Sequence, residues 1–187
     1  MPKGRLEAFS DGVIAIIITI MVLELKVPHG ASLEDLAPLW PVFLSYVLSF
    51  IYIGIYWHNH HHMLHSVKHV NGSVLWANSH LLFWLSLTPF TTAWMGENHF
   101  AQVPVAVYGI GLLLNAIAYT ILVRLLIRSH GRDSEFAARI GSDTKGVLSI
   151  ALYIAAVGLA FVSTTVSLVL FFTVAAIWFI PDRRFER

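Results

Sequence analysis

The chain has 187 residues, of which 57% are hydrophobic and only 12% charged, and its formal net charge is +1. Its mean hydropathy of +0.70 lies above the range of soluble globular proteins and is typical of integral membrane proteins. The near-neutral charge argues against a nucleic-acid partner, and the absence of cysteine excludes disulfides and thiolate metal sites.

The first apolar segment, residues 8–25, overlaps an unusual start, RLEAFSD at residues 5–11, which carries charged and polar side chains. We expect it to be retained, because no A-x-A-like cleavage site follows it. Between Asp11 and Glu24 only 12 residues are free of charge, and they span about 18 Å as a helix, against about 30 Å of hydrocarbon. Carboxylates at such depth are unfavourable against lipid, so we expect this helix inside an assembly. Alternatively, Ser10 or Asp11 caps the helix and Glu24 lies at the membrane interface.

One line of four residues on this helix combines small, polar and branched side chains. Spacings of i, i+4, i+7 and i+11 place them on one face. In a packed bundle this line would be a helix contact, with the threonine bonded to its own i−4 carbonyl. A pore constricted by apolar side chains is the alternative, and composition does not separate the two. The line consists of Gly12, Ile16, Thr19 and Leu23.

Further along the chain, three uncharged segments are each long enough to cross a bilayer, the third with Pro104 in its first turn. Residues 146–180 contain no charge and would measure about 52 Å as one helix, so they indicate two spans. The polar residues 163–167 are the expected turn between them. We therefore expect an all-α membrane protein with one six-helix domain, residues 1–187, and spans near residues 8–25, 36–57, 72–95, 101–124, 146–162 and 165–180.

Six spans place both chain ends on one side of the membrane. That side then collects the Lys and Arg residues, and only Lys26 falls opposite. Because positively charged loops face the cytoplasm, we expect cytoplasmic termini and a multi-pass protein of the cell membrane. A five-span arrangement would put the three C-terminal arginines outside. The basic residues on the expected cytoplasmic side are Lys3, Arg5, Lys68, Arg124, Arg128, Arg132, Arg139, Lys145, Arg183, Arg184 and Arg187.

A histidine cluster, HNHHHMLH, follows the second span and forms one stripe if the helix continues. Neutral imidazoles at i and i+4 bind zinc, copper or nickel and titrate near neutral pH. A histidine-dependent metal-ion transporter or sensor is therefore the alternative function, although no neighbouring carboxylate is available to complete such a site. The stripe consists of His58, His61, His62, His65 and His69, of which the first four are the candidate metal ligands.

The start of the first span, the end of the second and the start of the third all lie on the expected cytoplasmic side. We therefore expect a polar network that gives the charged start of the first helix its partners. Its expected members are Arg5, Ser10, Asp11, Trp57, His60 or His61, and Asn78. Asn115 lies midway along the fourth span, where it is expected to bond across helices or to have a local structural role.

Several of these residues belong to recognisable motifs. An RxxxFSD motif stands at the start of the first span, and a W-x-x-H-H element lies in YWHNHHHML at the end of the second. With VLWAN at residues 74–78 and the later Pro89-Phe90, the chain resembles the bacterial and archaeal relatives of the endosomal and lysosomal transmembrane potassium channel. The motif residues are Arg5, Phe9, Ser10, Asp11, Trp57, His60, His61 and Asn78.

The resemblance implies a homotetramer of six-helix subunits with a central pore lined by the first helix of each. It implies passive conduction of potassium and other monovalent cations without a TVGYG loop, which this chain also lacks. By position, the narrowest apolar ring falls on Ile16, with Thr19 and Leu23 further along and Gly12 on the same line. We expect no cofactor and no enzymatic reaction; the expected partners are copies of the chain, the lipid bilayer and the permeant potassium ion.

Overall fold

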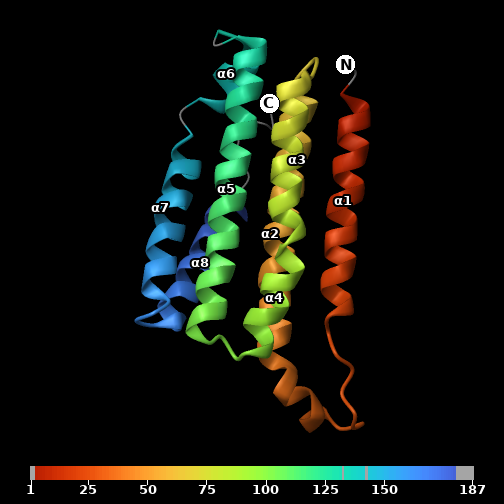
Figure 1. The fold of residues 1–187 in the computed structure, drawn as a ribbon, viewed down its shortest axis with the longest axis vertical. Coiled ribbons are helices and arrows are strands. Elements are labelled where there is room, and N and C mark those ends of the chain that lie inside the picture. Colours follow the sequence, from red (N-terminus) through yellow and green to blue (C-terminus); the bar gives the residue numbers. More distant parts are fainter. Residues whose placement is uncertain (1–2, 132, 142, 180–187) are drawn as a thin grey trace.

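The computed structural model describes residues 3–131, 133–141 and 143–179, which form a bundle of α-helices (Figure 1). The long helices alternate in direction, and α8 runs back toward the end of the bundle at which α1 starts. The elements are α1 (Gly4–Leu23), the 3-10 helix η1 (Leu33–Leu39), α2 (Trp40–His65), α3 (Gly72–Ser86), α4 (Thr88–Glu97), α5 (Gln102–His130), α6 (Glu135–Ile140), α7 (Thr144–Leu159) and α8 (Thr164–Phe179).

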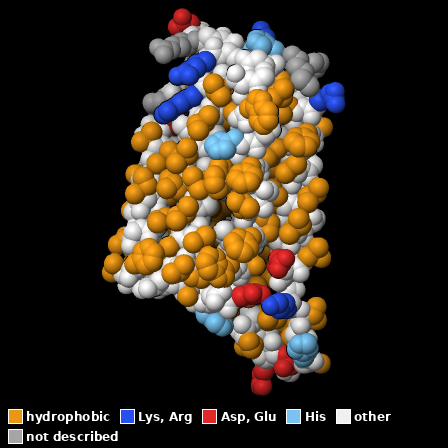
Figure 2. All heavy atoms as spheres, in the orientation of Figure 1, with side chains coloured by type: hydrophobic (Ala, Val, Ile, Leu, Met, Phe, Trp, Pro, Cys, Tyr) orange, Lys and Arg blue, Asp and Glu red, His pale blue; other side chains and the backbone are white. Residues whose placement is uncertain are grey.

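The surface suits a membrane. On the face shown in Figure 2, hydrophobic side chains form a broad band, with Lys and Arg at the end where α1 begins and mainly acidic side chains at the other. Within the described residues, three segments are long and apolar enough to cross a bilayer, namely Gly4–Leu23, Leu33–His65 and Gln102–His130, and α7 and α8 are shorter apolar helices. Outside the described residues lie Arg132, Arg183, Arg184 and Arg187, and the side chain of Arg139 is not described either.

The apolar segment at residues 72–95 is not one continuous helix but two in line, α3 and α4. The break falls at Leu87, and Pro89 lies in the first turn of α4. Because proline has no N–H, it cannot bond to the carbonyl four residues before it, and the helix must end and restart. The hydroxyl of Thr92 then donates to the carbonyl of Thr88 at 2.7 Å, within the first turns of α4.

The ends of the other helices also differ from expectation. Helix α1 begins at Gly4, so Ser10 and Asp11 lie inside it and cannot cap its N-terminus. The capping alternative is therefore wrong, and Ser10 Oγ instead donates to the Leu6 carbonyl at 2.8 Å. Helices α2 and α5 continue to His65 and His130, beyond the apolar residues that suggested their ends. The turn between α7 and α8 lies at residues 160–163, slightly before the expected polar turn.

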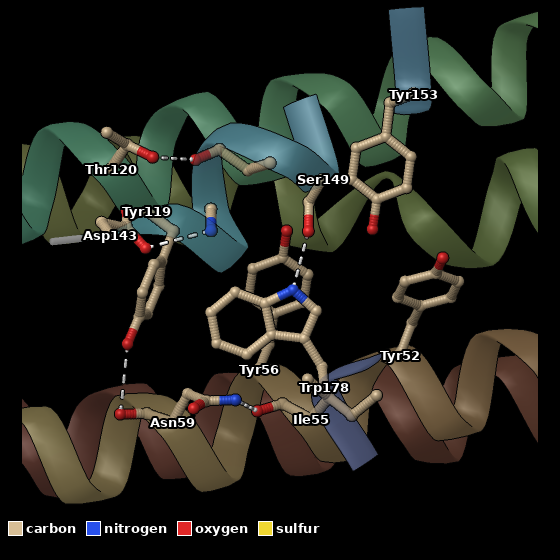
Figure 3. A pocket seen from close by; sticks show the side chains of 12 residues that line it. Tyr52, Ile55, Tyr56, Asn59, Tyr119, Thr120, Asp143, Ser149, Tyr153 and Trp178 are labelled. Carbon is tan, nitrogen blue, oxygen red and sulfur yellow. Dashed lines mark hydrogen bonds between the residues drawn. The ribbon is translucent and has the colours of Figure 1, made fainter. Parts of the chain in front are cut away.

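Aromatic side chains fix α2, α5, α7 and α8 to one another around a small cavity of about 40 Å³ (Figure 3). Two of their polar groups form hydrogen bonds between helices. Tyr119 donates to the carbonyl of Asn59 at 3.3 Å, and Trp178 Nε1 donates to Ser149 Oγ at 2.8 Å. Since buried polar groups without partners are unfavourable, these bonds define one packing of the four helices. Helices α3 and α4 pack on α5, and together these six helices form the scaffold against which α1 lies, through α2, α3 and α4.

Candidate ion pathway

Helix α1 has two distinct faces. Ser10, Ile14 and Ile17 on one face are buried against the rest of the subunit. On the opposite face, Ile16 is 59% and Leu23 is 79% exposed. The four residues of the line identified in the sequence all belong to this outer face, which no part of the described chain covers; they are Gly12, Ile16, Thr19 and Leu23.

The only hydroxyl on the outer line is already engaged. Thr19 Oγ1 donates its proton to the Ile16 carbonyl at 2.8 Å. This is the i−3 carbonyl rather than the expected i−4 carbonyl. Since the hydroxyl has given its proton to its own helix, its oxygen keeps lone pairs for another group. The outer face therefore presents apolar branched chains and one acceptor oxygen.

A buried chain of hydrogen bonds connects the inner face of α1 to α2 and α3. Asn78 Nδ2 donates to Ser10 Oγ at 2.9 Å, and Asn78 Oδ1 lies 2.7 Å from His60 Nε2. Ser10 and Asn78 are fully buried, and His60 is 2% exposed. Because the Asn78 Oδ1 accepts, His60 Nε2 carries the proton in this bond. Three expected members from three helices thus meet in one contact.

Other expected members of the network lie elsewhere. Trp57 Nε1 donates to Asp11 Oδ1 at 3.1 Å, a second link between α1 and α2. His61 does not join the buried chain; its ring stacks on that of Trp57, with centroids 6.1 Å apart. Phe9 is 59% exposed. Among the described residues the Arg5 side chain has no hydrogen bond or ion pair. Arg5 precedes Gly12 by seven residues, about two helical turns, so it lies on the outer face of α1, opposite the buried chain of hydrogen bonds.

Lys3, which was not expected in this site, also connects α1 to α2. Its Nζ donates to the carbonyls of Leu64 and His65, at 2.9 and 2.8 Å, in the last turn of α2. An ammonium group there satisfies carbonyls that lack helical partners and lies at the negative end of the helix dipole. The available signal was a lysine directly before the first helix, but the contact depends on α2 extending to His65.

The histidine stripe is present only in part. The Nε2 atoms of His58 and His62 lie 3.0 Å apart, and the rings of His61 and His65 stack at 6.1 Å. His69 lies beyond the end of α2 and stacks on His130, with centroids 4.4 Å apart, so it does not extend the stripe. In the part of the chain that the structure describes, no group of three or more His, Asp or Glu residues is arranged to hold a metal ion.

At its other end, α1 is tied to the scaffold by an ion pair. Lys26 Nζ donates to Glu97 Oε1 at 2.5 Å, joining the loop after α1 to the end of α4. That hydrogen bond and the charge of Glu97 raise the pKa of Lys26 above its ordinary value. The stabilisation from this raised pKa is present below the ordinary lysine pKa and is lost as pH rises through the raised value.

Glu97→Gln is therefore expected to lower the pKa of Lys26 toward its ordinary value. The amide keeps the size of the side chain but removes the negative charge that favours the ammonium form. NMR titration of labelled lysine side chains measures the change, with Glu34→Gln, an exposed carboxylate in η1, as the control. An unchanged Lys26 pKa in Glu97→Gln would show that the ion pair does not form.

The chain is similar in sequence to several known proteins. The profile of the family described as endosomal/lysosomal potassium channel TMEM175 matches residues 5–89, from the second residue of α1 to the first turn of α4. A potassium channel of Chryseobacterium sp. (strain P1-3) is 57% identical over 187 residues, 100% of this chain and 97% of the relative. A potassium channel of Streptomyces collinus is 35% identical over 177 residues, 89% of this chain and 86% of the relative.

The fold has a solved counterpart. The crystal structure of a lysosomal potassium-selective channel TMEM175 homolog from Chamaesiphon minutus matches with a TM-score of 0.83 at 32% identity, covering 95% of this chain and 96% of that one. The human endosomal/lysosomal proton channel TMEM175 is 30% identical over 116 residues, 56% of this chain and 23% of the human protein. The bacterial channels thus match over most of their length, whereas the human protein matches over part of its longer chain.

Proposed function

Because the chain belongs to the TMEM175 family of potassium channels, we propose that it conducts potassium passively through a pore lined by α1 of four identical subunits. It is an ion channel and not an enzyme. The observation that carries the pore proposal is the outer face of α1, where Ile16 and Leu23 are 59% and 79% exposed while the opposite face is bound to the scaffold. Four copies facing one another would cover this surface.

The alternative for this face is lipid, and the charges of α1 argue against it. Between Asp11 and Glu24 the helix has 12 uncharged residues, about 18 Å of a hydrocarbon layer of about 30 Å. A single helix facing lipid would have to place charge within the hydrocarbon or thin the bilayer, both of which are unfavourable. A water-filled path between four copies hydrates the same charges.

Conduction along this path would need no covalent chemistry. We expect ions to lose part of their hydration at a ring of Ile16 side chains, since apolar constrictions control permeation by excluding water. The free lone pairs of Thr19 would then offer a cation an oxygen ligand beyond the ring. Leu23 and Gly12 would line the wider parts on either side, and ions would move down their electrochemical gradient.

The topology proposed for the channel has six membrane crossings, with α3 and α4 forming one crossing together, in a single domain of residues 1–187. Lys3, Lys68 and Lys145 lie at or next to helix ends on one side of the bundle, Arg124 lies in the part of α5 that leads to that side, and Lys26 lies at the other side. The excess of positive charge supports a cytoplasmic position for that side and for both chain ends. The proposed location is the cell membrane.

Ion flux from reconstituted liposomes tests the proposed function. With potassium, sodium or caesium gradients as the only driving force, we expect uptake into channel-containing vesicles and none into protein-free vesicles. Potassium should exceed sodium, because the larger ion binds its water less tightly and dehydrates more easily at an apolar ring. Transport that required a second substrate or a proton gradient would contradict passive conduction.

A second candidate function, the histidine-dependent metal transporter or sensor, is favoured by the 3.0 Å contact between His58 and His62. The test replaces four histidines by alanine together, namely His58, His61, His62 and His65. If the channel proposal holds, potassium flux should stay within about twofold of wild type. The reason is that side chains outside the pore seldom shift the barrier to permeation by more than a few tenths of a kcal/mol. Liposome flux with potassium, and with Ni²⁺ or Zn²⁺, measures this. If the wild-type protein carried Ni²⁺ or Zn²⁺ and this variant did not, while its potassium flux stayed intact, the histidines would have a metal function in addition to the channel function.

A further inference from the structure

A crevice lies beside the break between α3 and α4, on the side facing α5. Its volume is about 210 Å³, and its lining includes Trp84, Leu87, Phe90 and Thr91 from α3 and α4 and Gly111 and Asn115 from α5. A cavity of about 150 Å³ lined by apolar side chains is large enough to bind benzene. The crevice therefore has room for a ring or a short hydrocarbon chain.

Asn115 supplies the polar feature of this crevice. Its side chain is 2% exposed, and its Oδ1 has no hydrogen-bond partner within the described residues. It lies near the middle of α5, at a depth where bulk water is absent if the helix crosses the membrane. Asn115 is one of the residues that line the crevice. A buried acceptor without a donor is unfavourable, so its amide oxygen calls for a donor that the described residues do not supply.

Two of the donors around the crevice are already used. Trp84 Nε1 donates to His80 Nε2 at 2.8 Å, and Thr91 Oγ1 donates to the Thr88 carbonyl at 3.2 Å. The Tyr119, Ser149 and Trp178 side chains around the cavity of Figure 3 also have partners in the protein, unlike Asn115 Oδ1. A ligand that fits the crevice beside Asn115 must therefore bring its own donor to Oδ1.

The crevice opens toward the hydrophobic band of the subunit. Three apolar residues on its rim, Leu87, Phe90 and Ile110, are 38%, 64% and 41% exposed. A ligand reaching it would come from the bilayer, where hydrocarbon is abundant and water is scarce. An ion is disfavoured, because the lining has no charged side chain to compensate it.

We propose that this crevice binds one neutral amphiphile from the bilayer, with its hydrocarbon part in the crevice and a hydroxyl group donating to Asn115 Oδ1. A hydroxyl is the smallest neutral group that supplies the missing donor. The site is independent of the pore, since α1 contributes no residue to its lining.

Photolabelling of the full-length protein in liposomes tests this site, using octanol that carries a diazirine and the matching octane without the hydroxyl. We expect the alcohol to label peptides containing Phe90 or Ile110 about fivefold more than the alkane, the factor that one neutral hydrogen bond provides. Excess unlabelled octanol should compete. Equal labelling by the two probes, or no labelling of these peptides because a neighbouring subunit covers the crevice, would overturn the proposal.

Two variants separate the hydrogen bond from the space. Asn115→Leu is expected to abolish the preference for the alcohol while keeping alkane labelling. Gly111→Leu should lower labelling by both probes, because a Cβ there would meet only Thr91 Oγ1, at 4.0 Å, and the larger side chain would fill the crevice. Thr173→Val, on α8, is the matched control and should label as wild type. Retained alcohol preference in Asn115→Leu would contradict the assignment, and labelling requires no ion flux, so this test is independent of the proposed function.

Discussion

Ile16→Asn is expected to raise potassium flux about tenfold, equivalent to lowering the barrier to permeation by about 1.4 kcal/mol. It is also expected to weaken the preference for potassium over sodium. An amide side chain keeps water in a constriction that isoleucine would dry, so ions would cross it with more of their hydration shell. Flux from liposomes under potassium and sodium gradients measures both effects.

Ile154→Asn is the matched control for this experiment. Ile154, on α7, is 57% exposed, close to the 59% of Ile16, and it has the same side chain on a different helix. Its replacement is expected to leave flux and ion preference unchanged. If Ile16→Asn also left both unchanged, Ile16 would not be the constriction. If both variants changed flux equally, the effect would belong to bilayer packing and not to a pore.

Asn78→Leu is expected to destabilise the folded protein by about 3 kcal/mol, because it leaves two buried groups, on Ser10 and His60, without their partner. The two lost hydrogen bonds measure 2.9 and 2.7 Å. A lower midpoint of thermal unfolding in detergent would reveal the loss. The control is Asn98→Leu at the end of α4, where an exposed amide bonds only to its own helix, and about 0.5 kcal/mol or less is expected.

A double-mutant cycle would show whether the bonds act as one unit. In the Asn78→Leu background, Ser10→Ala removes no further inter-helix bond, so its added effect is expected to be smaller than in wild type. Strict additivity of the two changes would mean that Ser10 and Asn78 do not interact. The same cycle with Trp57→Phe should be nearly additive, since Trp57 bonds to Asp11 and not to the buried chain.

Much of this network was predictable because topology alone brings the relevant helix ends together. The alternation of helices puts Ser10, His60 and Asn78 at one end of the bundle, and the structure joins them. Which of two adjacent histidines turns inward was not predictable, because that depends on the rotation of α2 set by its packing. Arg5 was expected in the network, although its seven-residue spacing from Gly12 already places it on the outer face.

Helix ends were harder to predict than helices. Pro89 was a visible signal for the break between α3 and α4, but the uninterrupted apolar run around it indicated one span. The ends of α2 and α5 extend through His and Arg residues, where hydropathy no longer marks a helix. The contact of Lys3 with the last carbonyls of α2 follows from that extension, so it could not be derived from the sequence.

The unbroken helical geometry of α1 also determines how a membrane voltage would act on the pore. Ile16 lies five residues after Asp11, and Glu24 lies thirteen after it, so at 1.5 Å per residue the proposed ring stands about 7.5 Å into a stretch of about 20 Å. We take the voltage to fall evenly between the two carboxylates. A cation that enters from the side where α1 starts and is held just before the ring would then cross about 0.4 of the membrane voltage. A permeant ion or charged blocker held there would therefore bind with an affinity that changes with voltage, by about 0.9 kcal/mol per 100 mV for a single charge.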